Sequence, residues 1–297
     1  LALAREALRD SHPGEAFERR YSVDPFYPDE IVWLHNERAV VRLAMGDLYE
    51  ASASLDRAFD VNTRHVECED RAHNWRRIRL NQITVDIEAG EIGLALRKIE
   101  EILSFSRKRR MLSEDQPAIA IALGYRGRAR HLQGDVARAV GDYATAIESL
   151  GELQESRALA YFLRLRAELG GQGAADDVKT ALEIALTTRQ MDIAYRLRIM
   201  MASQALSHNG DQPLLDHPRR ARAQRLLDDA MRYALQTDMH RIRVEASAAL
   251  AESRRLGGDY EGALRSVSDA LMVAARFGME LRKIWLRSLM ARIMAAR

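Results

Sequence analysis

The densest group of side chains that could bind a metal ion lies between residues 65 and 73. It contains His65, Cys68 and His73, together with the acidic residues Glu67, Glu69 and Asp70. Zinc sites favour close pairs of Cys or His residues held in tight turns. Here His73 follows Cys68 by five positions, and no distant pair completes the ligand set. We therefore expect neither a metal site nor another cofactor in this chain.

Nucleophilic catalysis and phosphate binding would each need residues that this sequence does not place together. Cys68 is the single cysteine, and no base that would activate its thiol can be identified. The run from Gly170 to Gly173 lacks the flanking strand and the lysine of a phosphate-binding loop. We expect a protein that is not an enzyme. A single cysteine also excludes an intrachain disulfide and suits a reducing compartment, so we expect a cytoplasmic protein.

Charge is distributed unevenly along the chain, although the formal net charge is only +2. Residues 44–70 include seven acidic and two basic side chains, whereas residues 97–130 include nine basic and four acidic ones. Such asymmetry can steer a polar partner. The alternative is that the acidic and the basic stretch are two solvated surfaces at loops between repeats and bind no partner. No basic stripe interleaved with aromatic residues supports nucleic-acid binding by Arg107 to Arg110, so we expect a protein or peptide partner.

The composition predicts an ordered, helix-rich protein. Hydrophobic residues make up 47% of the chain and charged residues 30%, with only 17 Gly and 6 Pro. No apolar run approaches the roughly 18 residues that a membrane-spanning helix needs. All the prolines fall between predicted helices, where a missing N–H group costs nothing. We identify no strand in the sequence.

The elements that must position any functional residues follow from a recurrence along the chain. Six helix-breaking turns are separated by 44, 44, 39, 45 and 40 residues, and they lie at Gly46, Gly90, Gly134, Gly173, Pro218 and Gly258. Five, nine and twelve positions after each turn stand a small, a large and a small apolar residue in most repeats, for example Ala139, Tyr143 and Ala146. This spacing places all three near one face of a helix. A period in this range predicts a solenoid of stacked helix pairs.

The recurrence resembles the tetratricopeptide repeat, most clearly in two stretches. Residues 127–147 and 251–271 carry the family's spaced positions, namely Gly127, Gly134, Asp135, Ala139, Tyr143 and Ala146 in the first and Ala251, Gly258, Asp259, Tyr260, Ala263 and Ala270 in the second. A third match consists of Ala39, Gly46, Asp47, Leu48, Ala51 and Ala58. The chain departs from the family at Arg126, where an apolar residue is usual, and at Ala174 and Ala175, which replace an acidic and an aromatic residue.

The period is longer than the usual 34 or so residues of this family. Units of this length resemble the variant repeats of MalT-type regulators and other bacterial signalling proteins, and the resemblance covers roughly residues 30–297. It implies an all-α, right-handed superhelix (α-solenoid) of about six antiparallel helix pairs plus a terminal helix. We expect residues 1–28 to form an N-terminal helix and an irregular linker, and residues 29–297 the repeat domain. The chain begins with Leu1, so we also expect a fragment or a trimmed N-terminus.

In superhelices of this family the first helix of each pair lines the inner face, so the resemblance implies a ligand recognised by successive first helices. Alignment to the family's inner positions gives the following candidates: Trp33, Asn36, Val40, Arg77, Asn81, Thr84, Arg128, His131, Glu245 and Glu252. We expect six of them to bind the partner, namely Asn36, Arg77, Asn81, Thr84, Arg128 and His131. All six fall in the first three repeats, before residue 135. Trp33, beside Ile31 and Val32, is expected in the core.

The function implied is that of a non-enzymatic interaction module that binds a protein or peptide on the concave face. The alternative is the sensor or regulatory domain of a larger signalling ATPase or transcription regulator whose effector domain is not in this chain. The full-length gene would discriminate between them, because a nucleotide-binding domain would accompany only the second.

Overall fold

The computed structural model describes residues 28–65, 68–108, 116–207 and 217–297, and these residues form thirteen α-helices and no strand. The helices are α3 (Pro28–Met45), α4 (Leu48–His65), α5 (Cys68–Ala89), α6 (Ile92–Lys108), α7 (Gln116–Leu132), α8 (Val136–Glu152), α9 (Ser156–Glu168), α10 (Ala174–Thr187), α11 (Met191–Ser207), α12 (His217–Gln236), α13 (His240–Leu256), α14 (Tyr260–Arg276) and α15 (Glu280–Ala296). The predicted N-terminal helix and linker lie outside the described residues.

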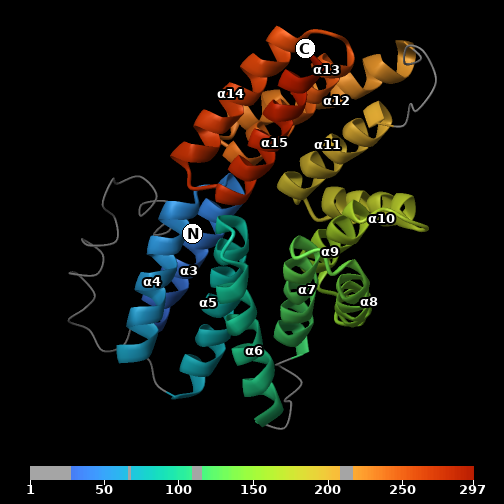
Figure 1. The fold of residues 1–297 in the computed structure, drawn as a ribbon. Helices are drawn as coiled ribbons and strands as arrows, with labels where there is room; N and C mark the ends of the chain where they lie inside the picture. The colour runs from blue at the N-terminus through green and yellow to red at the C-terminus, as the bar shows by residue number, and fades with distance from the viewer. Residues whose placement is uncertain (1–27, 66–67, 109–115, 208–216) are drawn as a thin grey trace.

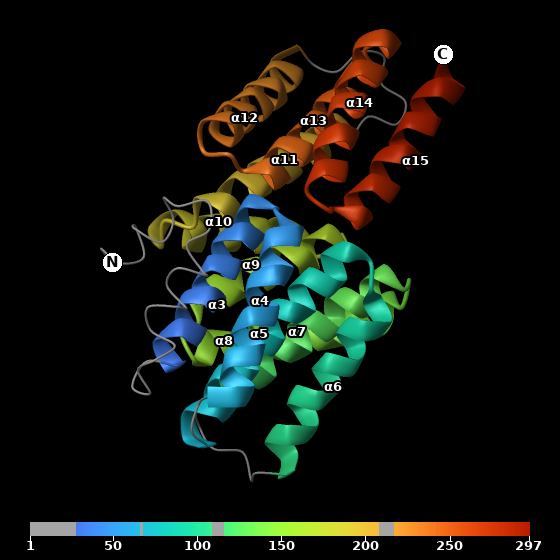
Figure 2. The ribbon, with the colours of Figure 1, turned by 90° about the vertical axis from the view of Figure 1, so that its left-hand side faces the viewer.

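Successive helices pack as six pairs, from α3 with α4 to α13 with α14, and α15 follows as a single terminal helix. Figure 1 shows the chain circling from α3–α6 through α7–α10 to α11–α15. In the view of Figure 2 the last helices, α11–α15, lie above the first ones. The predicted fold, an all-α right-handed superhelix of about six helix pairs plus a terminal helix, is confirmed.

The pattern of small, large and small residues after each turn forms the interface within each pair. In α8, the second helix of the third pair, the side chains of Ala139, Tyr143 and Ala146 are fully buried. The equivalent positions of the other repeats are buried as well, except Leu182, which is half-buried. Small residues let the backbones approach, and the large one fills the space between them. Gly127 of α7 shows how close this approach is, because a Cβ atom there would lie 2.9 Å from the ring of Tyr143.

Turns of the sequence Gly-Asp end the first helix of a pair and begin the second. Gly134 has a φ of +83°, a conformation that favours glycine, and Asp135 accepts a hydrogen bond from the N–H of Arg138 in the first turn of α8. Gly258 and Asp259 repeat this arrangement before α14. Pro218 differs from its predicted role as a turn, because it stands in the first turn of α12. A proline fits there since the first N–H groups of a helix have no partner within it.

The two ends of the superhelix meet. The N–H of Leu48, at the start of α4, donates a hydrogen bond of 3.0 Å to the carbonyl of Phe277, which follows α14. A single hydrophobic core includes Val32 and Leu43 of α3 together with Val244 of α13 and Leu286 of α15. Each repeat of an open solenoid contacts only its neighbours. This one instead closes through a contact between its first and last repeats.

Trp33 is not in the core as expected. Its neighbours Ile31 and Val32 are buried, whereas 47% of Trp33 is exposed. Successive residues of a helix are separated by about 100°, so two adjacent buried residues leave the third on the outer face.

No helix of the described residues combines the length and the apolar character that crossing a bilayer requires.

Candidate functional site

A cavity of about 450 Å³ lies at the centre of the superhelix, and its walls come from the first helices of the pairs. Helices α3, α5, α7, α9, α11 and α13 each contribute at least one lining residue, and Glu155 caps the start of α9. We call this cavity the central pocket. Pockets for small ligands have volumes of roughly 300 to 1,000 Å³, so the central pocket is large enough for a small molecule or a short stretch of peptide.

One wall of the central pocket is polar and comes from α3 and α5. The amide of Asn81 donates a hydrogen bond of 2.9 Å to the amide oxygen of Asn36. Beside it, Arg77 forms an ion pair of 2.9 Å with Glu37, and both side chains are partly exposed. Thr84 lines the same wall one turn further along α5. The polar wall therefore presents amide, carboxylate, guanidinium and hydroxyl groups to the central pocket.

A second wall is aromatic and comes from α7 and α9. The rings of Tyr125 and Phe162 meet edge to face with centroids 5.4 Å apart, and Tyr161 meets Tyr125 at 6.1 Å. Edge-to-face contacts of this kind hold rings in fixed orientations. Burial raises the pKa of the Tyr125 hydroxyl, with a smaller contribution from Tyr161, so this group stays neutral and can act as a hydrogen-bond donor.

Two buried arginines, Arg196 of α11 and Arg241 of α13, also line the central pocket. Arg196 binds Glu245 through two parallel contacts, from Nε to Oε2 at 3.0 Å and from Nη2 to Oε1 at 2.9 Å. Such bidentate pairing fixes the guanidinium plane. Arg241 has a weaker partner, because its Nη2 atom lies 3.4 Å from Oε2 of Glu88. We call the part of the pocket formed by these two arginines its buried end.

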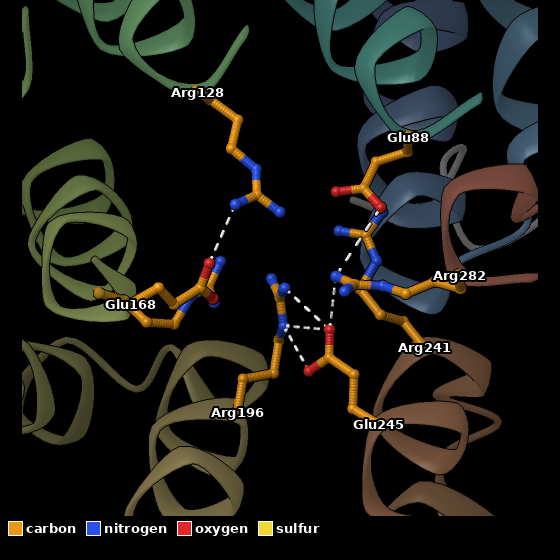
Figure 3. Close-up of polar contacts among 8 residues, drawn as sticks. Glu88, Arg128, Glu168, Arg196, Arg241, Glu245 and Arg282 are labelled. Carbon is orange, nitrogen blue, oxygen red and sulfur yellow. Dashed lines mark hydrogen bonds and ion pairs between the residues drawn. The ribbon is translucent and has the colours of Figure 1, made fainter. Parts of the chain in front are cut away.

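The two arginines of the buried end belong to a larger network of charged side chains from α5, α7, α9, α11, α13 and the terminal helix α15 (Figure 3). Arg128 of α7 contacts Glu168 of α9 at 3.0 Å, and Arg164 contacts the same carboxylate. Arg282 of α15 lies 2.8 Å from Glu245 and 3.9 Å from Glu88. We call these eight residues the inner charge network: Glu88, Arg128, Arg164, Glu168, Arg196, Arg241, Glu245 and Arg282. The network links the ends of the superhelix, since Glu88 belongs to α5 and its partners to α13 and α15.

The arginines of the network determine the ionisation of its carboxylates. Burial alone would raise the pKa of Glu88, but the nearby charges of Arg241 and Arg282 outweigh it and lower the pKa to about 2. The pKa of Glu245 is lowered in the same way, chiefly by Arg196 acting against burial. Arg164 shows the reverse effect: burial and the positive charge of Arg196 lower its pKa. The network therefore holds its carboxylates charged and contains more positive charge than they neutralise.

The structure brings four of the six predicted partner-binding residues together in the central pocket: Asn36, Arg77, Asn81 and Thr84. Arg128 belongs to the inner charge network instead. His131 lies one turn further along α7, half-buried, with no hydrogen bond to its buried Nδ1 atom; burial and the nearby Arg128 lower its pKa.

The other aligned inner positions also have defined surroundings. Val40 lines the pocket, and Glu245 belongs to the network. Glu252 forms an ion pair of 2.8 Å with Arg255 on the same helix.

Sequence reasoning missed most of the inner charge network and the aromatic wall. A usable signal was present, because Arg164 interrupts the apolar run from Leu163 to Leu165 and Arg196 interrupts the run from Ile193 to Leu197. A charge inside an apolar run of a helix indicates a buried cation that needs a partner. The partners themselves lie on other repeats, so their identity could not be read from either run.

The basic stretch at residues 97–130 is partly neutralised within the fold. Arg126 binds Asp142 through two contacts, and Arg130 reaches the same carboxylate at 2.7 Å. Lys98 pairs with Asp86 at 2.7 Å. These basic residues therefore have partners in the structure and contribute less to a positive surface than their number suggests.

The group of His, Cys and acidic residues between positions 65 and 73, at which we expected no metal site, cannot be compared fully with the structure, because the side chains of residues 65–70 are not described. Over the parts of the chain whose side chains are described, no three His, Cys, Asp or Glu residues gather as metal ligands.

No family model matches the sequence, and no curated protein matches it either. Among solved structures, the helical repeat protein RapI in its apo form has the same fold, with a TM-score of 0.57. The match covers 97% of this chain and 96% of the RapI chain at 15% sequence identity. At this identity the likeness concerns the fold alone. Fold and pocket together define a class by architecture, an all-α helical-repeat solenoid with a central pocket.

Proposed function

We propose that this chain is a non-enzymatic interaction module that binds a peptide, or an extended segment of a protein, in the central pocket. The observation that carries the proposal is the origin of the pocket walls, since six successive first helices contribute side chains to one cavity. A ligand there would contact every helix pair of the superhelix. The likeness to RapI supports the fold on which this proposal depends.

The chemistry of the walls suits a peptide backbone. A carboxamide side chain offers both a donor and an acceptor, as a peptide group does, so Asn36 and Asn81 could exchange their mutual hydrogen bond for bonds to a ligand backbone. Tyr125 and Tyr161 offer apolar ring surface for ligand side chains. We propose Asn36, Arg77, Asn81 and Thr84 as direct contacts. Arg128 and His131 would act on the inner surface beside the pocket.

The test is a binding screen with a soluble library of random short peptides, followed by calorimetry on the peptides recovered. Ala158 is half-buried in the pocket wall, so Ala158→Trp should fill the cavity and abolish binding. Ala144 lies on the exposed face of α8, so Ala144→Trp is the matched control and should bind normally. Arg77→Ala, compared with Arg97→Ala on the exposed face of α6, gives a second pair of variants with less effect on packing. Equal binding by all four variants would place the site elsewhere.

The alternative function, a sensor domain of a larger signalling ATPase or transcription regulator, stays a prediction, as does location in the cytoplasm. Repeat lengths of 39 to 45 residues support the finer resemblance to MalT-type repeats. The sequence of the full-length gene tests this alternative directly.

A further inference from the structure

The buried end of the central pocket carries more positive charge than the protein neutralises. The inner charge network contains five arginines but only three glutamates. Burying charge is costly unless each charge has a partner, and an excess of buried cations is therefore unfavourable in the protein alone. The lowered pKa of Arg164 has this origin, since burial and Arg196 both disfavour its charged form. An anion bound near these arginines would offset the imbalance.

Arg241 lines the pocket and has two buried nitrogen atoms without a hydrogen bond. Only 7% of its side chain is exposed. Its Nε and Nη2 atoms are buried and donate no hydrogen bond to any described residue, and Glu88 at 3.4 Å is its ion-pair partner. Most buried polar groups in proteins are hydrogen-bonded. Arg196 beside it donates hydrogen bonds from Nε and Nη2 to Glu245, so the buried donors without a hydrogen bond at this end are those of Arg241.

The negative charges that line the pocket lie among its more exposed residues. Glu37 is paired with Arg77, Glu155 is exposed, and Asp192 is half-buried. None of these three carboxylates is paired with Arg241 or Arg196 in the structure. The more exposed residues of the pocket thus carry both signs of charge, since Arg77 and Arg157 lie there too, whereas the charged lining residues of the buried end are the two arginines.

We propose that the buried end of the central pocket binds an anionic group of the ligand, and that this group is the C-terminal carboxylate of the bound peptide. The proposal rests on the proposed function. A carboxylate accepts charge-assisted hydrogen bonds from a guanidinium, which are stronger than hydrogen bonds between neutral groups. Arg241 is the residue that receives it, because it lines the pocket and its Nε and Nη2 atoms have no hydrogen-bond partner. The peptide accordingly enters with its carboxyl end first.

The experiment compares each peptide recovered from the screen in two forms, the free acid and the C-terminal amide. The amide should bind the wild-type protein roughly 10- to 100-fold more weakly, because a charge-assisted hydrogen bond is lost. Arg241→Met should bind both forms equally. Since this change also removes a partner of Glu88, the double variant Glu88→Gln with Arg241→Met keeps the shape without either charge and should behave the same way. Arg97→Met on α6 is the control and should retain the preference.

Inorganic phosphate is a second probe that does not depend on peptide binding. At constant ionic strength it should raise the midpoint of thermal unfolding of the wild type in a saturable manner, and it should have no such effect on the double variant. Equal affinity of acid and amide for the wild type would overturn the proposed carboxylate site but leave the peptide-binding function intact. If no peptide binds and phosphate still stabilises only the wild type, the proposal that the anion belongs to a peptide is wrong, and the ligand is a free anion. Absence of both effects overturns the site altogether.

Discussion

Glu88 on α5 and Arg241 on α13 form an ion pair of 3.4 Å that joins the second helix pair of the superhelix to the sixth. Arg282 of the terminal helix reaches the same carboxylate at 3.9 Å. Together with the hydrogen bond from Leu48 to Phe277, these contacts close the solenoid. The central pocket lies inside this closed turn, so its shape depends on the first and last repeats at once. A ligand in the pocket can therefore stabilise contacts between residues far apart in the sequence.

Substituting alanine for Gly46 and for Gly134 distinguishes two effects on stability, the strain of a left-handed turn and the loss of the contact that closes the superhelix. Both have a left-handed backbone, with φ of +90° and +83°. A Cβ atom on Gly46 would lie 2.9 Å from the backbone nitrogen of Arg241, whereas nothing lies within 4 Å of one on Gly134. Gly46→Ala should therefore lower the unfolding temperature more than Gly134→Ala. It should also increase amide hydrogen exchange in α13. Equal effects of the two substitutions would show that the closure adds little to stability.

Glu245→Gln should destabilise the protein strongly. The carboxylate of Glu245 forms ion pairs with both Arg196 and Arg282. Without it, these two largely buried guanidinium groups lose a negatively charged partner. Breaking a buried ion pair from one side costs about 3 to 5 kcal/mol. Glu261→Gln is the matched control, since Glu261 pairs with Arg297 at an exposed position and such pairs contribute about 0 to 1 kcal/mol. Urea denaturation measures both. A loss at Glu245 no larger than that at Glu261 would contradict a buried network.

Stability should fall in acid, partly because of Glu88. Its pKa is about 2 in the folded protein, against an ordinary value of 4.5. The unfolded chain therefore takes up a proton first as the pH falls, and the stabilisation is complete above about pH 5 and is lost progressively toward pH 2. For Glu88 the full effect is about 3 kcal/mol.

Glu88→Gln removes this contribution, so the difference in unfolding free energy between wild type and variant should shrink from pH 6 to pH 3. Denaturation by urea at several pH values measures it. A difference that does not change with pH would mean that Glu88 is not held as a carboxylate by Arg241 and Arg282.

Ala146→Leu should destabilise the third helix pair. Ala146 is fully buried on α8, so a larger side chain forces the pair apart at a cost of about 1 to 3 kcal/mol. Ala144, two residues earlier, is exposed, and Ala144→Leu should have little effect. Thermal unfolding followed by circular dichroism compares the two. A lower midpoint for Ala144→Leu than for Ala146→Leu would show that the buried face of α8 is misassigned.

The sequence by itself determined the local structure and the repeat. Gly46, Gly134 and Gly258 end helices because their left-handed backbone suits glycine, and the small, large and small residues five, nine and twelve positions later mark the face that packs. These features depend on residues close together in the chain, so their spacing is enough to predict them. The inner position of Asn36 and Asn81 follows from the same register, and both line the central pocket; whether they bind a partner stays a prediction.

Only the tertiary structure decided that the superhelix closes, which charges meet inside it and what the pocket contains. The contact between Glu88 and Arg241 depends on the small rotation that each repeat adds to the one before it, summed across the three helix pairs that lie between them. That rotation is determined by the volumes of all the side chains at the helix interfaces. A sequence pattern records which residues face inward, but not the angles that bring α5 and α13 together. The network formed by Arg196, Arg241 and their carboxylates therefore became visible only in three dimensions, because its members belong to different repeats.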